Sequence, residues 1–217
     1  DLSKKLKIKR FIFLSTIGVH GNKSKGDKNI NESSPLKCMD VYSKSKLSAE
    51  KSLKNESFNT STELVILRPA VVYGKDCPGN LRKLVKFVDL NIPFPIKKIY
   101  NSRSLIYINN LISAINTSLI CPNLAGEVFV IADKEIISTK ELISLISKAR
   151  NKKSYFFYVP KFIFRLLKKI PFLRKKISQL TENLKIDSKK FRERTGWEQP
   201  YNQKEAIINS FSFPAND

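Results

Sequence analysis

Tyr42 and Lys46 are the residues whose types and spacing best suit chemistry in this sequence. They stand four positions apart within residues 39–58, a segment predicted to be helical, so their side chains share one face. A tyrosine hydroxyl titrates near pH ~10 and needs a nearby cation to favour its phenolate at neutral pH. Lys46 is placed to supply that cation. The spacing therefore predicts an acid/base pair, and no other of the seven tyrosines has a lysine or arginine four residues on.

The spacing alone is weak evidence, because 40 lysines and arginines among 217 residues produce about one such pair by chance. An ordinary solvated helix face is the alternative. The setting of the pair favours catalysis, since an apolar run at residues 8–14 precedes it and ends in the hydroxyls of Ser15 and Thr16. A second apolar run, residues 63–67, follows it and ends in an arginine–proline pair.

The two apolar runs with a helix between them form the strand–helix–strand pattern of a parallel sheet. Ligands of such sheets bind beyond the carboxyl ends of the strands, where Ser15, Thr16 and Pro69 would lie. Shorter elements follow. The sequence predicts strands at 104–108 and 127–132, and helices at 80–91, from 109, at 138–148, 160–177, 187–196 and 203–210.

The composition is that of a folded globular chain, with 41% hydrophobic and 27% charged residues. The net charge of +21 by itself suggests a phosphate-bearing or anionic partner. The lysines are spread through every segment, however, so no nucleic-acid partner is expected. Cys38, Cys77 and Cys121 are scattered, and His20 is the only histidine, so neither disulfides nor a metal site are predicted. No membrane-spanning run is visible, and a cytoplasmic location is expected.

Five segments occur in the order and spacing of a known protein family over nearly the whole chain. They are residues 11–21, 42–50, 67–74, 103–111 and 196–197. Together they resemble the extended short-chain dehydrogenase/reductases, in the NAD-dependent nucleotide-sugar epimerase/dehydratase branch that is UDP-glucose 4-epimerase-like. The resemblance implies an α/β fold with two parts. Residues 1–75 would form the C-terminal part of a Rossmann-type parallel sheet, and residues 76–217 would form mainly a smaller α/β substrate domain. The alternative is that the last Rossmann elements are interleaved with this second domain.

The resemblance also assigns roles at the carboxyl ends of the strands. Tyr42 is the acid/base that takes a proton from a sugar hydroxyl while hydride leaves the carbon for the nicotinamide. Lys46 binds the nicotinamide ribose, and Thr16 bridges the substrate oxygen and the tyrosine. Pro69 and Ala70 neighbour the cofactor, which is expected to be NAD, with NADP as the alternative. For Thr16 the competing interpretation is a strand-end hydroxyl that bonds the backbone.

Asn80 and Arg103 align with the family positions that hold the diphosphate of a nucleotide sugar. With Thr16 they form the expected substrate-binding set for a UDP-sugar or another nucleotide sugar. A helix cap is the alternative for Asn80, and a surface arginine near a strand is the alternative for Arg103. His20 is expected to be a loop residue and not a catalyst.

Two departures from the family pattern shape the expected function. No G-x-x-G-x-x-G occurs among the seven glycines, so the sequence predicts the carboxyl two-thirds of such an enzyme, lacking the N-terminal dinucleotide-binding part and binding the cofactor poorly. Ile17 and Gly18 replace the Asp-Glu of family dehydratases, which disfavours elimination. An epimerase is therefore expected. A 4-keto-sugar-nucleotide reductase of polysaccharide biosynthesis is the alternative, and a non-catalytic remnant or basic binding module is the alternative of another class.

Residues 160–177 mix phenylalanines and leucines with lysines and arginines, and Pro171 divides them into two short helices. Such a segment suits a helix lying on an anionic membrane, or substrate-domain helices whose apolar faces pack inward. Inward packing is the preferred interpretation, and peripheral membrane contact through 160–177 is the alternative. The resemblance also suggests a homodimer.

Overall fold

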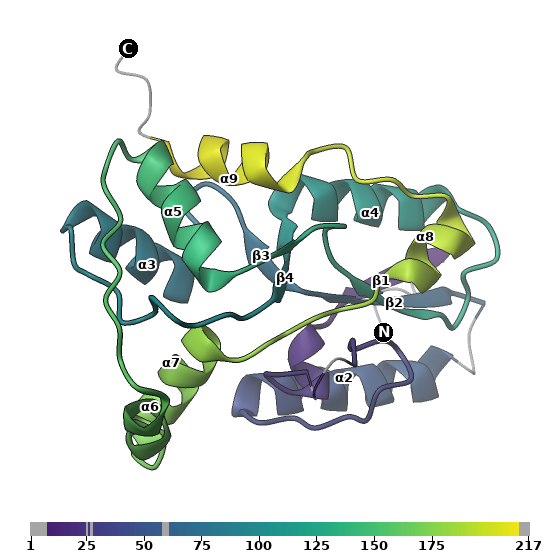
Figure 1. Ribbon diagram of the computed structural model, residues 1–217. Helices are drawn as coiled ribbons and strands as arrows, with labels where there is room; N and C mark the ends of the chain where they lie inside the picture. Colours follow the sequence, from purple (N-terminus) through teal and green to yellow (C-terminus); the bar gives the residue numbers. More distant parts are fainter. Residues whose placement is uncertain (1–7, 25, 27, 58–60, 213–217) are drawn as a thin grey trace.

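The computed structural model describes residues 8–24, 26, 28–57 and 61–212 of the chain. Its first sheet is parallel, with the strand order β1-β2-β5, and comprises β1 Arg10–Leu14, β2 Glu63–Pro69 and β5 Val128–Ile131 (Figure 1). The second sheet has the order β3-β4-β6 and comprises β3 Val71–Tyr73, β4 Arg103–Tyr107 and β6 Ile136–Ile137. In it, β3 and β4 are parallel and β6 is antiparallel to β4. The predicted α/β fold with a parallel sheet is confirmed.

Helices cover these sheets. They are η1 Ile17–His20, α2 Val41–Ser57, α3 Asn80–Asp89, α4 Ile108–Ile120, α5 Thr139–Ala149, α6 Lys161–Leu167, α7 Pro171–Thr181, α8 Lys189–Thr195 and α9 Gln203–Phe211. Figure 1 shows α2 on one side of the parallel sheet and α4 on the other. Strand β2 is buried from Leu64 to Pro69, which explains its continuous apolar sequence. Among the helices described, none is long and apolar enough to cross a membrane.

The hydrophobic core forms two clusters, one for each sheet. Around the parallel sheet, Phe129 packs on Phe191 with ring centroids 5.2 Å apart, and Phe191 packs on Trp197 at 5.6 Å. Around the second sheet, α3, α5 and α9 bury a separate set that includes Ile143 and Ile207. The molecule therefore has two packed bodies that share the junction between β2 and β3.

Local sequence signals set several of these element ends. The predicted helix at 39–58 begins at Val41, because the Asp40 carboxylate accepts the backbone N–H of Ser43 at 2.9 Å and caps the helix. Position 58 lies outside the described residues. The predicted cap at Ser138 is confirmed by a 3.0 Å bond from the Glu141 N–H to its hydroxyl. Pro171 starts α7, as predicted, at its first position.

Three short elements escaped prediction: the helix η1 and the strands β3 and β6. All are shorter than five residues, too short for a periodic pattern to be recognised. Strand β5, which comes from the predicted substrate segment, pairs with β2 in the parallel sheet. The domain boundary between residues 75 and 76 stays a prediction.

Candidate active site

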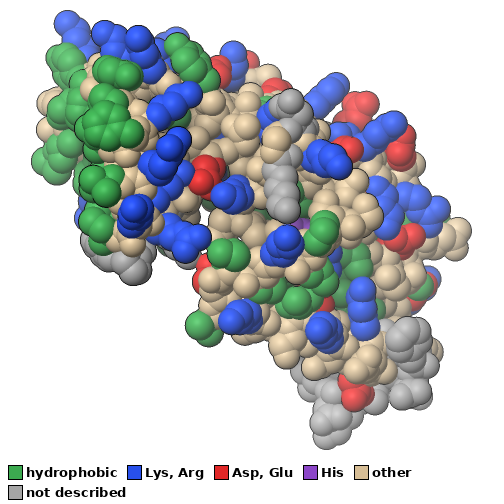
Figure 2. Space-filling model, turned by 60° about the horizontal axis from the view of Figure 1, so that its bottom comes forward, with side chains coloured by type: hydrophobic (Ala, Val, Ile, Leu, Met, Phe, Trp, Pro, Cys, Tyr) green, Lys and Arg blue, Asp and Glu red, His purple; other side chains and the backbone are tan. Residues whose placement is uncertain are grey.

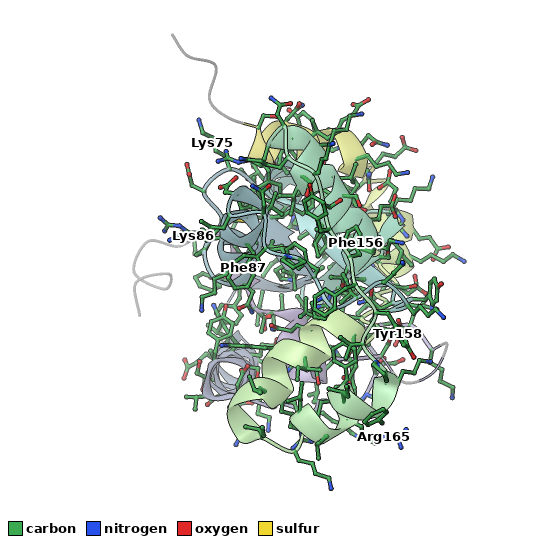
Figure 3. All side chains as sticks on the ribbon, turned by 60° about the vertical axis from the view of Figure 1, so that its left-hand side comes forward. Lys75, Lys86, Phe87, Phe156, Tyr158 and Arg165 are labelled. Carbon is green, nitrogen blue, oxygen red and sulfur yellow. The ribbon has the colours of Figure 1, made fainter. Side chains whose placement is uncertain are left out.

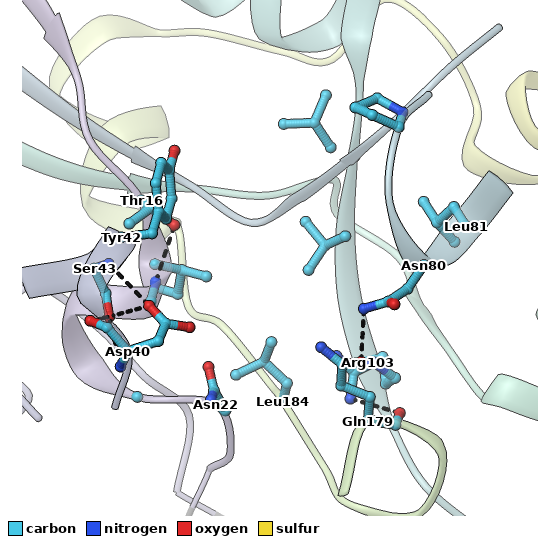
Figure 4. A pocket seen from close by; sticks show the side chains of 16 residues that line it. Thr16, Asn22, Asp40, Tyr42, Ser43, Asn80, Leu81, Arg103, Gln179 and Leu184 are labelled. Carbon is cyan, nitrogen blue, oxygen red and sulfur yellow. Dashed lines mark hydrogen bonds between the residues drawn. The ribbon is translucent and has the colours of Figure 1, made fainter. Parts of the chain in front are cut away.

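A cavity of about 300 Å³ opens between the carboxyl end of β1, the first turn of α2, strand β3 and the start of α3 (Figure 4). It is lined by Thr16, Ile17, Gly18, Gly21, Asn22, Asp40, Tyr42, Ser43, Val71, Val72, Pro78, Asn80, Leu81, Arg103, Gln179 and Leu184. Four of the predicted site residues are therefore brought together, although they come from segments as far apart as residues 16 and 103.

Thr16 follows β1 and caps η1. Its side-chain oxygen accepts the backbone N–H of Gly18 at 3.1 Å, so the hydroxyl hydrogen is left to donate elsewhere. The capping bond predicted as the competing interpretation is thus present, but it uses only one lone pair. Because the residue also lines the cavity, its hydroxyl remains suited to bridge a substrate oxygen.

Tyr42 lies in the first turn of α2, lines the cavity and keeps 60% of its surface exposed. Lys46 lies one turn further on, with its ammonium nitrogen 5.9 Å from the centre of the Tyr42 ring. The same ammonium donates to the Leu14 carbonyl at 2.8 Å, which fixes it at the carboxyl end of β1. One of its three hydrogens is used in that bond, so it can still donate to a ligand. The helical spacing thus gives the predicted proximity.

A buried ionic network supports this wall of the cavity. Arg68, at the end of β2, donates to both carboxylate oxygens of Glu50 on α2, at 3.0 and 2.5 Å. Both side chains are almost fully buried. Burial is the largest single influence and would raise the pKa of Glu50, but the hydrogen bonds and charge of Arg68 act together with other neighbouring groups to leave the pKa below its usual value.

His20 completes the network. Its Nε2 lies 3.0 Å from Nη1 of Arg68, and its Nδ1 lies 2.9 Å from the Ser34 carbonyl. A guanidinium can only donate, so Nε2 accepts and Nδ1 carries the hydrogen of a neutral ring. Burial, and then the charge of Arg68, lower the pKa of His20. The expectation of a loop residue was wrong: His20 is a buried part of η1 that ties this helix to β2 and α2.

Arg103 lies opposite, at the start of β4. Its Nη1 donates to the carbonyls of Gln179 at 3.0 Å and Glu182 at 3.3 Å. Within the described residues it forms no salt bridge, so its charge lies near the cavity with backbone carbonyls as its only bonded partners. Burial lowers the pKa of Arg103, but the group stays charged. The remaining N–H donors suit a phosphate or carboxylate.

Asn80 is the first residue of α3, and its amide donates to the Gln179 side-chain oxygen at 2.7 Å. The helix-cap alternative is wrong, because Gly79 occupies the cap position and no side chain bonds there. Gln179 from α7 thus connects to both Asn80 and Arg103. It was not predicted, since it lies 99 residues from Asn80 in the sequence.

Pro69 and Ala70 are not among the lining residues. Pro69 ends β2 opposite Ile131, and Ala70 is buried with its N–H bonded to the Ile131 carbonyl at 2.8 Å. The next two residues, Val71 and Val72, do line the cavity. Contact of Pro69 and Ala70 with a cofactor stays a prediction. Among the residues described, no cluster of histidine, cysteine and carboxylate side chains suits a metal ion.

Residues 1–155, most of the chain, match the model of the 3-beta hydroxysteroid dehydrogenase/isomerase family. The chain belongs to this family. It is 33% identical over 201 residues to a UDP-glucose 4-epimerase of Vibrio cholerae, covering 92% of this chain and 61% of that relative.

A more distant relative is the N-acetyl-alpha-D-glucosaminyl-diphospho-ditrans,octacis-undecaprenol 4-epimerase of Escherichia coli O157:H7. It is 29% identical over 157 residues, which cover 70% of this chain and 46% of the relative. This chain therefore spans about three fifths of the length of the first relative and less than half of the second.

Solved structures share the fold of this chain. The UDP-glucuronic acid 4-epimerase of Bacillus cereus in complex with NAD has a TM-score of 0.76 and 22% identity, over 96% of this chain and 62% of that one. The UDP-glucose 4-epimerase of Thermotoga maritima with UDP-glucose has a TM-score of 0.71 and 19% identity, over 96% and 64%. The chain thus shares its fold with these two epimerase structures.

Proposed function

We propose that this protein is an NAD-dependent 4-epimerase of nucleotide sugars. One observation carries the proposal: a single cavity has a hydroxyl and a phenol, Thr16 and Tyr42, on one wall and, on the other, the guanidinium of Arg103, which bonds backbone carbonyls and forms no salt bridge with a described residue. The first wall suits proton transfer at a sugar hydroxyl, and the second suits the diphosphate of a sugar nucleotide. The 33% sequence identity to a UDP-glucose 4-epimerase supports the same substrate class.

The residues present fit one end of NAD. Lys46 holds its ammonium at the carboxyl end of β1, beside Tyr42, and can still donate to the hydroxyls of a ribose. No glycine-rich turn that would hold the cofactor's diphosphate occurs in the sequence, so we expect weak binding of free NAD. When bound, NAD supplies the acceptor and later the donor of hydride at the sugar carbon.

Side chains of this protein transfer the proton of the reacting sugar hydroxyl. Tyr42 takes the proton of the hydroxyl on the carbon that is oxidised, and Thr16 donates a hydrogen bond that holds the reacting oxygen near the phenol. Lys46 places its positive charge one helical turn from the phenol, 5.9 Å from the centre of the ring. After the keto group presents its other face, Tyr42 returns the proton to the oxygen. The nucleotide stays bound through Arg103, with Asn80 beside it.

Calorimetric titration with UDP-glucose tests the binding half. Since hydrogen bonds to charged groups contribute about 1.5–3 kcal/mol, Arg103→Ala is expected to weaken binding by about 10- to 150-fold. Arg82→Ala is the matched control, because Arg82 is exposed on α3 and does not line the cavity. Equal affinity of the two variants and the parent chain would overturn the assignment of Arg103.

Product analysis with added NAD tests the reaction half. An epimerase converts UDP-glucose to UDP-galactose with no net change in NADH, whereas a 4-keto-sugar reductase consumes one NAD(P)H for each product. Stoichiometric consumption would favour the reductase. A cooperatively melting chain that binds neither UDP-glucose nor NAD would favour the non-catalytic alternative.

A further inference from the structure

Helix α6 presents an apolar row to solvent. Phe162, Leu166 and Ile170 recur every four residues and are 66%, 60% and 48% exposed. Phe162 and Leu166 lie one helical turn apart on α6, and Ile170 follows just beyond the helix, where the N–H groups of Lys169 and Ile170 bond carbonyls three residues back. The inner side of α6 is apolar as well, with Phe164 buried. The outer row is therefore not needed to attach α6 to the protein.

A basic row lies beside it. Lys161, Arg165 and Lys169 recur at the same spacing, one position earlier, and all three are exposed. None of them forms an ion pair with any residue in the described ranges, whereas Lys168 on the inner side pairs with Glu182 at 2.7 Å. Lys161 and Arg165 also line a shallow cleft of about 250 Å³ whose floor includes Phe164. We call the two rows together the α6 face.

The surroundings extend this pattern. Tyr158, 52% exposed, precedes the apolar row by four residues, and Lys98 stands over its ring at 5.1 Å. Figure 3 shows Tyr158 and Arg165 at the outer surface of the α6 end. Figure 2 shows exposed apolar side chains gathered among lysines and arginines at one end of the molecule. Large apolar side chains bordered by uncompensated cations mark a binding surface and not a solvated helix face.

We propose that the α6 face docks on the surface of an anionic lipid membrane. Phe162 and Leu166 enter the boundary between headgroups and acyl chains, and the basic row contacts lipid phosphates. Charge decides between this partner and a second copy of the chain. A symmetric pairing of two α6 faces would bring two basic rows together, in molecules that each have a net charge of +21.

The proposal links the membrane to the cavity without depending on the proposed reaction. Helix α7 follows the α6 face directly and ends beside the cavity, where Gln179 bonds Asn80 and Arg103. Docking would therefore hold the Arg103 wall near the lipid surface. Failure of UDP-glucose binding would leave this proposal standing, because the α6 face shares no residue with the cavity lining.

Flotation of the whole chain with vesicles tests the proposal. We expect binding to vesicles of phosphatidylcholine with 30% phosphatidylglycerol, weaker binding at high salt, and little binding to phosphatidylcholine alone. The triple variant Lys161→Gln, Arg165→Gln, Lys169→Gln should bind about 100-fold more weakly, since each basic residue near such a surface contributes about five-fold. Phe162→Ser with Leu166→Ser should bind about ten-fold more weakly.

Matched controls lie on other elements. Leu119→Ser with Ile120→Ser removes two exposed apolar side chains at the end of α4, and Lys134→Gln, Lys189→Gln, Lys204→Gln removes three exposed charges. Both controls should bind vesicles within about three-fold of the parent, because distant charges are screened beyond about 10 Å. Unchanged melting temperatures would show that all variants fold.

Three outcomes would overturn the proposal. One is absence of binding to the anionic vesicles. Another is an equal loss in the α6 variants and in their controls, which would indicate adhesion by total charge. The third is self-association of the parent chain in sedimentation that only the α6 variants abolish, without vesicle binding, which would make the α6 face a contact between copies.

Discussion

The two walls of the cavity each depend on an arginine, and the two arginines are used differently. Arg68 lies behind the Thr16–Tyr42 wall, where its guanidinium donates hydrogen bonds to Glu50 and His20 in the interior. Arg103 forms the opposite wall and bonds two backbone carbonyls through one nitrogen. A guanidinium neutralised by a carboxylate can only hold structure in place, whereas one with bonds only to carbonyls still attracts an anion. Arg68 therefore belongs to the wall that fixes geometry, and Arg103 to the wall that we propose binds the nucleotide.

The largest expected effect is on turnover, through Tyr42 on the geometry-fixing wall. Tyr42→Phe removes the group that we propose transfers the proton, so turnover should fall by about 100- to 10,000-fold. The dissociation constant for UDP-glucose should change by less than about two-fold, because the ring remains and the phenol acts on the reacting oxygen only. Initial rates and calorimetry on one preparation check both values. Tyr100→Phe, at a residue 87% exposed and outside the cavity, is the control. A Tyr42 variant with the parent's rate would remove Tyr42 from the catalytic set.

The next effect is on stability, through the buried pair. Glu50→Gln leaves the Arg68 charge buried without its partner, and the free energy of unfolding should fall by about 3–5 kcal/mol in urea titration. Replacing both residues at once, Glu50→Leu with Arg68→Met, should cost less. Glu193→Gln removes an exposed pair with Lys189 and should cost no more than about 0.5 kcal/mol. A loss for Glu50→Gln as small as that of the control would contradict the structural role of Arg68.

A smaller effect concerns the binding wall. Gln179→Ala removes the acceptor of the Asn80 amide but leaves the carbonyl that holds Arg103. A neutral hydrogen bond contributes about 0.5–1.5 kcal/mol, so UDP-glucose should bind about two- to ten-fold more weakly. Asn80→Ala in the same background should add little, since both changes remove one bond. Additive losses would show that Asn80 and Gln179 act separately.

The smallest effects are pH dependences of stability, and the first comes from His20. Its pKa in the folded protein lies below the unfolded value of about 6.5, so between the two the unfolded chain binds more protons. Stability should therefore fall as the pH drops below about 6.5, by at most about 1.4 kcal/mol per pH unit. Urea titrations between pH 5 and 8 measure the slope. His20→Gln, which keeps an acceptor for Arg68, should abolish it in this window.

Asp133 gives the opposite sign on the side of the second sheet. Its carboxylate accepts neutral donors, the Tyr73 hydroxyl at 3.1 Å and the Asn110 amide at 2.8 Å, and burial raises its pKa. The folded state then keeps the proton to a higher pH than the unfolded chain does. Stability therefore falls as the pH rises from the pKa of Asp133 in the unfolded chain to its pKa in the folded protein. Asp133→Asn should flatten this fall. The same slope in the variant and the parent would mean that another group titrates.

Local signals in the sequence determined several parts of this protein. The four-residue spacing placed Lys46 next to Tyr42 on α2, because a helix brings residues i and i+4 onto one face. The apolar runs predicted β1 and β2 and their parallel pairing, and Ser138 and Pro171 marked helix starts. Such features rest on periodicity, capping and turn chemistry within a few residues.

Tertiary structure alone decided the remainder. The bonds of Gln179 to Asn80 and of His20 to Arg68 join residues 99 and 48 positions apart. The outward position of Phe162 and the inward position of Phe164 were likewise not fixed by a segment that is apolar on both sides. A short window of sequence records which faces are apolar, but not which partner will cover them. That choice depends on how the whole chain buries its surface at once.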